Sequence, residues 1–503
     1  MKKAGLITVF VFSVLFTFLF YKHSAGLNLL LFETAVFGML LITKKNKLKN
    51  PNSIYVFSGT LLSVILVVIN NSVLSIVVNL ISFYVLTGIL IYPEARSLLS
   101  SFQLATHNIF SSTVYFFKEI FTYGGKSLKF WNKIIKLRII IIPLIIIVVF
   151  IILYHLSNPV FEKYLNITGT HISNILDKIF SGINVELIFI YIFGLAVSIF
   201  IFMRVRNERI ISYDINTDDI LQRVRRPKNL RNLQMAPLVN ELSAGVFMLF
   251  VLNVLILFLN IIDIYWVWFN FEWNGQYLKQ FVHEGTYLLI ISILISIAII
   301  LFFFRGNLNF YRKNKLLKIL SYAWLGQNCI LAASVAIRNF WYIHYFSLAY
   351  GRIGVLFFLL LTLFGIYTVI IKIRRKKSSF YLFRTNCLAL YLLLILMAAF
   401  NWDNIIARYN FSHYKSAFIH YNFLSTLSDK ALSYLDKSMD DLKEIDKIQK
   451  TLFPFEEKYM NINNYYDAVQ KRKNVFLKKW ESKDILEWNY AEYRAYQELK
   501  KNK

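Results

Sequence analysis

Seven ionisable side chains stand at the ends of apolar segments in the second half of the chain. They are carboxylates, guanidinium groups and one imidazole: Asp263, His283, Glu284, Arg338, Arg352, Asp403 and Arg408. A charged group in or near hydrocarbon is costly, so each one needs a partner or a role. The adjacent His283 and Glu284 could act as acid and base, and an arginine could stabilise an oxyanion or a phosphate.

Three interpretations of this charged cluster stay open at the level of sequence. Arg338 or Arg352 could bridge Asp263 or Glu284 in an ion-pair network that locks helix ends together. The same groups could form a ligand or transport site, because ionisable residues within membranes often mark pathways. In the third interpretation His283 and Glu284 carry out catalysis.

Amide side chains lie inside the apolar segments themselves. They are Asn253, Asn260, Gln327, Asn328 and Asn386. The spacing of the first two with Asp263, at i, i+7 and i+10, places all three on one helix face. Amides that line a continuous path favour a transporter. Amides that cap one another are interhelical hydrogen bonds, worth under about 2 kcal/mol each.

About eleven apolar stretches position these residues, and each is long enough to cross about 30 Å of hydrocarbon as a helix. They cover residues 4–21, 27–43, 53–70, 73–91, 138–155, 184–203, 242–263, 284–304, 316–338, 353–372 and 380–400. Lys and Arg crowd every second gap, at 44–49, 126–138, 204–231, 305–315 and 372–377. Because basic loops stay on the cytoplasmic side, the pattern predicts a cytoplasmic N-terminus and an extracytoplasmic C-terminus. The alternating direction of the spans brings the seven ionisable residues to one depth on the outer face.

The composition is that of a membrane protein, and the basic loops between the spans explain the net charge. Hydrophobic residues make up 57% of the chain, and the formal net charge is +27. In a soluble protein that charge would indicate nucleic acid. Here the basic cytoplasmic loops account for most of it, so we expect no nucleic-acid partner. Membrane lipids, anionic ones among them, are the expected partners of such loops.

The sequence predicts an all-α polytopic transmembrane bundle in five parts. These are a four-span region (1–92), a cytoplasmic amphipathic segment in the membrane interface (93–137), two spans with an outer loop and a basic loop (138–240), a five-span core (241–400) and an extracytoplasmic helical tail (401–503). The Trp- and Tyr-rich loop 264–283 is expected to lie flat on the outer surface. Pro454 is expected to divide the tail into two helical parts.

Signatures of enzymes and of metal sites are sparse. His283-Glu284 is not followed by a His at the spacing that zinc proteases need, and no phosphate-binding glycine loop or nucleophile elbow is present. Cys329 and Cys387 both lie inside apolar stretches, which predicts buried thiols rather than a disulfide or a metal site. We therefore expect no cofactor and no metal.

Short segments of the second half carry a likeness to a known family. They are Asn260–Asp263, Trp266–Phe269, Phe281–Tyr287, Tyr322–Trp324, Ile337–Asn339, Arg352–Val355, Ile406–Asn410, Leu424–Ser428 and Trp488–Asn489. Over roughly residues 230–500 the chain resembles the bacterial polytopic membrane proteins called domain of unknown function DUF 4173, with DUF 4153 as a related family. Before Arg352 that family tends to show Tyr-Gly-Leu-Thr, whereas this chain has Phe346-Ser347-Leu348-Ala349. The resemblance implies a bacterial cytoplasmic membrane with the tail outside, and the family has no assigned mechanism.

The sequence as a whole predicts an integral protein of the bacterial cytoplasmic (inner) membrane. The leading hypothesis is a non-enzymatic membrane component that presents the ionisable residues and the tail to a partner protein or an envelope ligand. Two alternatives stay open: a secondary transporter, and a membrane-embedded envelope enzyme that uses His283 and Glu284.

Overall fold

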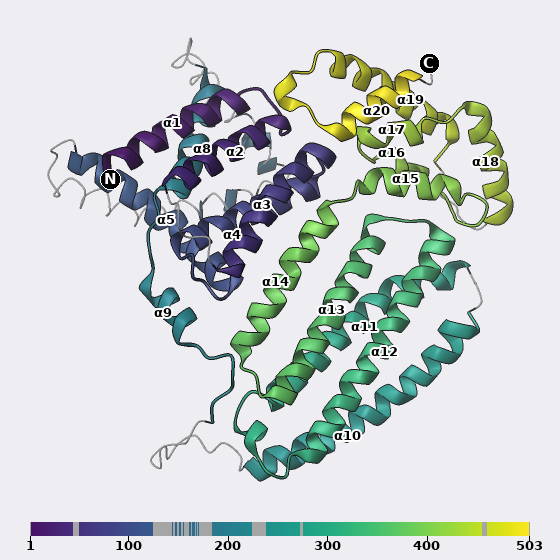
Figure 1. Ribbon diagram of the computed structural model, residues 1–503. Helices are drawn as coiled ribbons and strands as arrows, with labels where there is room; N and C mark the ends of the chain where they lie inside the picture. Colours follow the sequence, from purple (N-terminus) through teal and green to yellow (C-terminus); the bar gives the residue numbers. More distant parts are fainter. Residues whose placement is uncertain are drawn as a thin grey trace.

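The chain is described by a computed structural model, and its described residues fold into helices (Figure 1). These residues are 2–43, 50–123, 184–223, 238–271, 275–454 and 460–501, with separate positions between 143 and 170, and the side chains of 275–284 are not among them. Pairing of the β type within this part of the chain is limited to one isolated bridge, between Ile220 and Lys377. The all-α prediction is confirmed.

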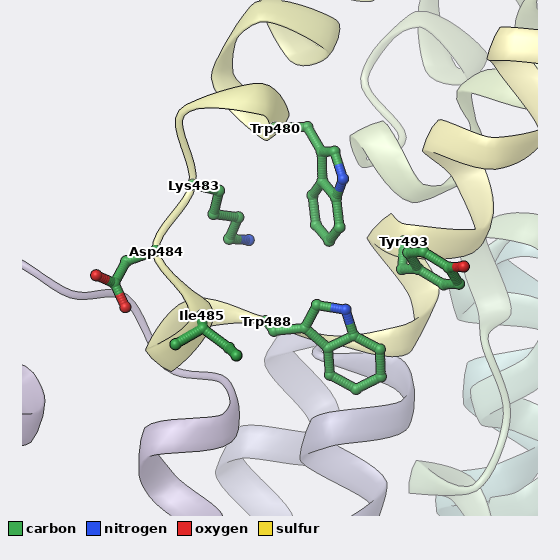
Figure 2. Close-up of a pocket in the computed structure, with 6 residues that line it drawn as sticks. All are labelled: Trp480, Lys483, Asp484, Ile485, Trp488 and Tyr493. Carbon is green, nitrogen blue, oxygen red and sulfur yellow. The ribbon is translucent and has the colours of Figure 1, made fainter.

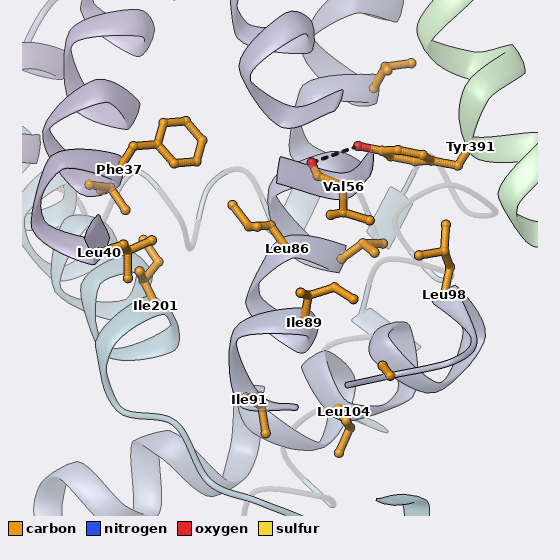
Figure 3. Close-up of a cluster of buried hydrophobic side chains, with 14 of the residues drawn as sticks. Phe37, Leu40, Val56, Leu86, Ile89, Ile91, Leu98, Leu104, Ile201 and Tyr391 are labelled. Carbon is orange, nitrogen blue, oxygen red and sulfur yellow. Dashed lines mark hydrogen bonds between the residues drawn. The ribbon is translucent and has the colours of Figure 1, made fainter. Parts of the chain in front are cut away.

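Most helices of the first group pack around one large apolar core. The group consists of α1 (Lys2–Phe20), α2 (Leu27–Thr43), α3 (Pro51–Asn70), α4 (Val73–Ile91), α5 (Leu98–Tyr123), α8 (Val185–Phe202) and α9 (Glu208–Asn216). Helices α1, α5 and α8 share a second, smaller core. Helix α1 pairs with α8, and α3 pairs with α4. Figure 3 shows buried side chains from several of these helices meeting, with Val56, Leu86 and Ile89 at the centre.

Turn chemistry explains why α3 and α4 form a tight hairpin. Asn50 caps α3, and Pro51 occupies the first helical position, where its missing N–H is no loss. At the other end Asn71 adopts the left-handed conformation, with φ 43°, and its N–H bonds to Val67 O. Ser72 then caps α4 in a reciprocal box with Ser75.

The second group holds the helices that carry most of the predicted site. It consists of α10 (Leu238–Asp263), the π-helix η1 (Ile264–Phe269), α11 (Gly275–Phe303), η2 (Asn307–Phe310), α12 (Lys315–Phe346), α13 (Tyr350–Arg375) and α14 (Ser379–Ala398). Helix α12 is central and packs against α10, α11 and α13. Helix α14 packs against α13 and also against α3, α4 and α5, so it joins the two groups (Figure 1).

Helices extend further at one end of the second group than the sequence predicted. The segment 264–283 was expected to be a loop lying flat on the surface, but η1 continues α10 directly and α11 begins at Gly275. Trp268 Nε1 donates to Ser334 Oγ at 2.9 Å, and Trp341 Nε1 donates to Val267 O at 3.0 Å. These two indole bonds hold η1 against α12.

Residues 401–501 form a helical C-terminal domain with its own core. Its elements are α15 (Trp402–Ser412), α16 (Tyr421–Ser425), η3 (Asp429–Ala431), α17 (Leu432–Leu435), α18 (Met439–Leu452), α19 (Ile462–Glu481), η4 (Ile485–Glu487) and α20 (Tyr490–Lys501). Leu424, Leu432, Leu435 and Leu499 are fully buried at its centre. Helix α18 ends two residues before Pro454, as expected for a residue that cannot continue a helix.

Eight of the described helices are long and apolar enough to cross a membrane, and two further apolar helices, Gly5–Phe20 and Leu27–Leu40, are shorter. The predicted span 138–155 lies largely outside the described residues. We call the end of the bundle that meets the C-terminal domain the tail face; it is formed by the turns 21–26, 71–72, 347–349 and 399–401. The opposite end, formed by residues 92–97, 203–207, 304–314 and 376–378, is called the basic face. Helix α5 contacts α4, α8 and α1 toward this basic face.

Candidate functional site

Asp263 and Arg338 form a buried ion pair near the tail face. Asp263 ends α10 and Arg338 lies on α12, and Nη2 of the arginine is 2.5 Å from Oδ1 of the aspartate. The residues are 2% and 5% exposed, so water screens the pair very little. A Cβ added at Gly285 would lie 3.4 Å from Arg338 Nη1, which places α11 beside the same guanidinium group. The pair thus joins α10 to α12, with α11 beside it.

Arg352 has a different environment from Arg338. Its guanidinium group lies over the ring of Tyr342, with 3.6 Å between Cζ and the ring centroid, and the residue is 4% exposed. Asn339 Nδ2 donates to the backbone oxygen of Arg352 at 3.0 Å. Among the described side chains, Arg352 Nη1 has no hydrogen-bond partner. The ion pair with Asp263 therefore belongs to Arg338.

Asp403 belongs to the C-terminal domain rather than to the Asp263 pair. It lies on α15, and its two carboxylate oxygens accept hydrogen bonds from the hydroxyl groups of Tyr350 and Ser428. Tyr350 begins α13, so Asp403 ties the domain to the bundle. Arg408 is exposed on α15. His283 and Glu284 lie in α11, and their side chains are outside the described residues. The structure thus joins one pair of the seven predicted residues and separates Asp403 and Arg408 from it.

The intramembrane amides form hydrogen bonds between and along helices. Gln327 Nε2 donates to Asn253 Oδ1 at 2.8 Å, Asn253 Nδ2 donates to Leu320 O at 3.1 Å, and Asn260 Nδ2 donates to Gln327 O at 3.2 Å. This ladder links α10 to α12. Asn328 Nδ2 bonds to Trp324 O, one turn away on its own helix, and Asn386 Nδ2 bonds to Thr368 Oγ1 on α13. Those that run between helices hold the helices together, at under about 2 kcal/mol each.

The C-terminal domain is fastened to the first group of helices at two turns. The Lys430 ammonium group donates to the backbone oxygen of Asn71, in the α3–α4 turn. Burial lowers the pKa of Lys430, and the nearby carboxylates of Glu492 and Asp403 oppose that shift. In the α1–α2 turn, Ser24 Oγ donates to Glu487 at 2.9 Å.

Ser347, between α12 and α13, has a backbone conformation that disfavours a side chain, with φ 68° and ψ 169°. Strain of this kind costs about 1–3 kcal/mol, and glycine avoids it. Ser347 Oγ donates to Phe418 O at 2.8 Å, which ties the C-terminal domain to this turn.

We expect Ser347→Gly to leave the free energy of unfolding unchanged or to raise it, because relief of strain offsets one hydrogen bond of about 1 kcal/mol. Ser347→Ala keeps the strain and loses the bond, so it should lower that free energy by about 1 kcal/mol. Denaturant titration of both variants in mixed micelles measures the difference. A Gly variant less stable than the Ala variant would contradict the strain at this turn.

An aromatic pocket lies at the edge of the C-terminal domain (Figure 2). Trp480, Lys483, Asp484, Ile485, Trp488 and Tyr493 line it, and its volume is about 320 Å³. The Lys483 ammonium group lies 5.2 Å from the Trp480 ring centroid and also pairs with Glu492. The Trp488 and Tyr493 rings are 6.0 Å apart. Flat aromatic faces with a few polar groups are the usual lining of a ligand site.

The pocket was not predicted from the sequence. Its available signal was the recurrence of Trp480, Trp488 and Tyr493 within one short stretch of a charged tail. No group of three potential metal ligands is present among the residues that the structure describes. Cys329 and Cys387 are free and half-buried.

The amino-acid sequence matches a known family of proteins. The family described as Domain of unknown function (DUF4153) matches residues 56–438, which is more than half of the chain. The chain belongs to this family. The DUF4153 match begins within α3 and ends just before α18, so it covers all of the second group and the first group without α1, α2 and the start of α3. It starts well before the range 230–500 suggested by the sequence resemblance, and it stops before the aromatic pocket. No curated protein and no solved structure matches the chain.

Proposed function

We propose that this multi-pass membrane protein lies in a bacterial cytoplasmic membrane and holds its C-terminal domain outside the cytoplasm to bind an envelope ligand. The observation that carries the proposal is the aromatic pocket on a domain that is fastened to both groups of helices. Asp403 fastens the domain to α13, and Lys430 fastens it to the α3–α4 turn. A domain held in this way presents its pocket at a constant place relative to the membrane.

The distribution of charge supports this orientation. Basic side chains gather at the basic face, and they include Arg96, Arg204, Arg206, Arg305, Arg312, Lys313, Arg374, Arg375, Lys376 and Lys377. The positive-inside rule assigns such an end to the cytoplasm. The C-terminal domain lies at the opposite end of the helices (Figure 1). The ten described apolar helices and the predicted span 138–155 make eleven spans. An odd number of spans places the two ends of the chain on opposite sides of the membrane.

The chemistry of the pocket favours a saccharide as the envelope ligand. Trp480, Trp488 and Tyr493 present flat apolar rings, on which the apolar face of a sugar ring can stack. Lys483 supplies hydrogen-bond donors toward sugar hydroxyl or acidic groups. In Figure 2 the Lys483 side chain extends toward the Trp480 ring, while Asp484 points away from it. Asp484 instead accepts from Leu486 N at 2.8 Å and shapes the turn.

Binding of soluble envelope saccharides to the full-length protein in nanodiscs tests the proposal. We expect Trp488→Ala to weaken binding about tenfold, since a stacked ring in a pocket contributes at least about 1.4 kcal/mol. Trp266→Ala is the matched control, because Trp266 is 59% exposed on η1, away from the pocket. Isothermal titration calorimetry measures both. Absence of binding to any saccharide, or equal binding by the Trp488 variant, would refute the proposal.

A further inference from the structure

A buried carboxylic acid that has no cationic partner among the described residues lies in the first group of helices. Glu33, on α2, is 2% exposed. The Asn79 side chain on α4 hydrogen-bonds to its carboxyl group. Two oxygens in this pair have no hydrogen-bond partner among the described residues: Glu33 Oε2 and Asn79 Oδ1. Buried polar atoms are nearly always paired, so two unpaired acceptors on contacting side chains need an explanation.

We propose that Glu33 binds a proton and shares it with Asn79, forming a proton-binding site inside the first group of helices. A proton on Oε2 makes that oxygen a donor, and Asn79 Oδ1 is then the available acceptor. The amide of Asn79 in turn donates to the other carboxyl oxygen, so acid and amide form a complementary pair. One proton thereby provides a partner for both oxygens.

The surroundings of Glu33 supply hydroxyl groups rather than charges. Asn79 Nδ2 also donates to Ser63 Oγ at 3.2 Å. Ser63 donates to Thr60 O at 2.8 Å, and Thr60 bonds to Val56 O and to Ser82 O. The chain of buried polar groups ends at Tyr391 on α14, whose hydroxyl group donates to Val56 O at 3.4 Å (Figure 3).

The charged residues of the neighbouring described helices lie near the ends of those helices. Helices α3 and α4 contain no charged residue, and those of α1 are Lys2 and Lys3 at its opposite end. Arg384 of α14 pairs with Asp219 at the basic face. At the tail face, His23 and Glu487 pair with each other. An ionised carboxylate without a cation is very unfavourable in such a medium, which favours the protonated acid.

The site lies near the tail face, which is the side from which the proton would enter. Glu33 lies six residues into α2, and Asn79 lies six residues into α4, both counted from the tail face. At 1.5 Å per residue, the pair is about 9 Å inside the helix ends.

The competing occupant, a sodium ion, requires several free oxygen ligands. The hydroxyl groups of Ser63, Thr60 and Ser82 are already bonded to backbone oxygens. Proton-binding carboxyl groups at such depth are a component of proton-coupled membrane proteins.

Labelling with dicyclohexylcarbodiimide tests the proposal on the full-length protein in nanodiscs. This apolar reagent takes up the acid proton on its nitrogen while the carboxyl oxygen adds to its central carbon, and the adduct rearranges to a stable N-acylurea. We expect Glu33 to be labelled at neutral pH, to lose labelling as the pH rises, and to be unaffected by sodium ions. Peptide mass spectrometry measures the site.

Asp263 in the same sample is the matched control, because its carboxyl group is paired with the Arg338 guanidinium group and we expect it to stay unlabelled. Glu33→Gln should abolish the label at this peptide. The pH series needs only the wild-type protein, so a variant that fails to fold does not affect it. Glu33 unlabelled at neutral pH, or labelling blocked by sodium ions at constant pH, would overturn the proposal.

Discussion

Replacing Arg338 by Met is expected to lower the free energy of unfolding by about 3–5 kcal/mol. The substitution removes the guanidinium group that lies 2.5 Å from Asp263 and leaves a carboxylate that is 2% exposed without that cation. Uncompensated buried charge is among the costliest defects in a folded protein. Denaturant titration in mixed micelles, followed by circular dichroism, measures the change.

Two further variants separate the ion pair from general effects of losing an arginine. Arg408→Met removes the same side chain from an exposed position and should change the free energy of unfolding by less than about 0.5 kcal/mol. The double variant Asp263→Asn with Arg338→Met removes both charges and should recover much of the loss, as replacement of whole buried pairs does. A double variant as unstable as the sum of the two single variants would show that the two charges do not interact.

Hydrophobic length was enough to predict most of the described apolar helices. The predicted segment 73–91 coincides with α4, and the predicted segment 380–400 nearly coincides with α14. These predictions succeed because burial of apolar length is a property of each segment alone. The helical structure of residues 264–269 could not be predicted from apolar length. Trp and Tyr suggested an interfacial loop, whereas indole bonds to α12 hold a π-helix.

Pairing between side chains depends on packing, which a single sequence does not contain. The sequence placed seven ionisable residues near one depth, but depth does not determine lateral position. Arg338 faces α10, whereas Arg352, fourteen residues later and after a turn, stacks on Tyr342. Asp403 has uncharged partners, Tyr350 and Ser428, which no charge argument selects.

Glu33 shows the opposite error, in which a residue that could bind a proton was overlooked. Glu33 is a single glutamate in the predicted span 27–43, and neither apolar length nor loop charge assigns a role to it. The structure buries this glutamate and brings Asn79 to it from another helix. The chain therefore contains two buried carboxyl groups with different partners: Asp263 has a guanidinium group and Glu33 has an amide. The Asp263 carboxyl group is thus paired with a cation, whereas Glu33 is the group proposed above to bind a proton.

Gly26→Ala is expected to release the pocket edge of the C-terminal domain from the bundle. An added Cβ would lie 2.5 Å from the backbone oxygen of Glu487 and 2.6 Å from its carbonyl carbon. These are backbone atoms that cannot rotate away, so the α1–α2 turn and η4 must separate. Such overpacking costs about 1–3 kcal/mol. The bond from Leu27 N to Trp488 O, at 3.0 Å, should be lost with it.

Hydrogen–deuterium exchange of the full-length protein measures this release. Amides of residues 484–493, which include the turn that lines the pocket, should exchange faster in Gly26→Ala than in the wild-type protein. Gly38→Ala is the matched control, on the helix α2 that follows the α1–α2 turn, because an added Cβ there meets nothing within 4 Å. Since the pocket depends on a docked η4, the Gly26 variant should also bind saccharides more weakly. Unchanged exchange in both variants would mean that η4 does not rest on the α1–α2 turn, and the pocket would then not be held at a constant place above the membrane.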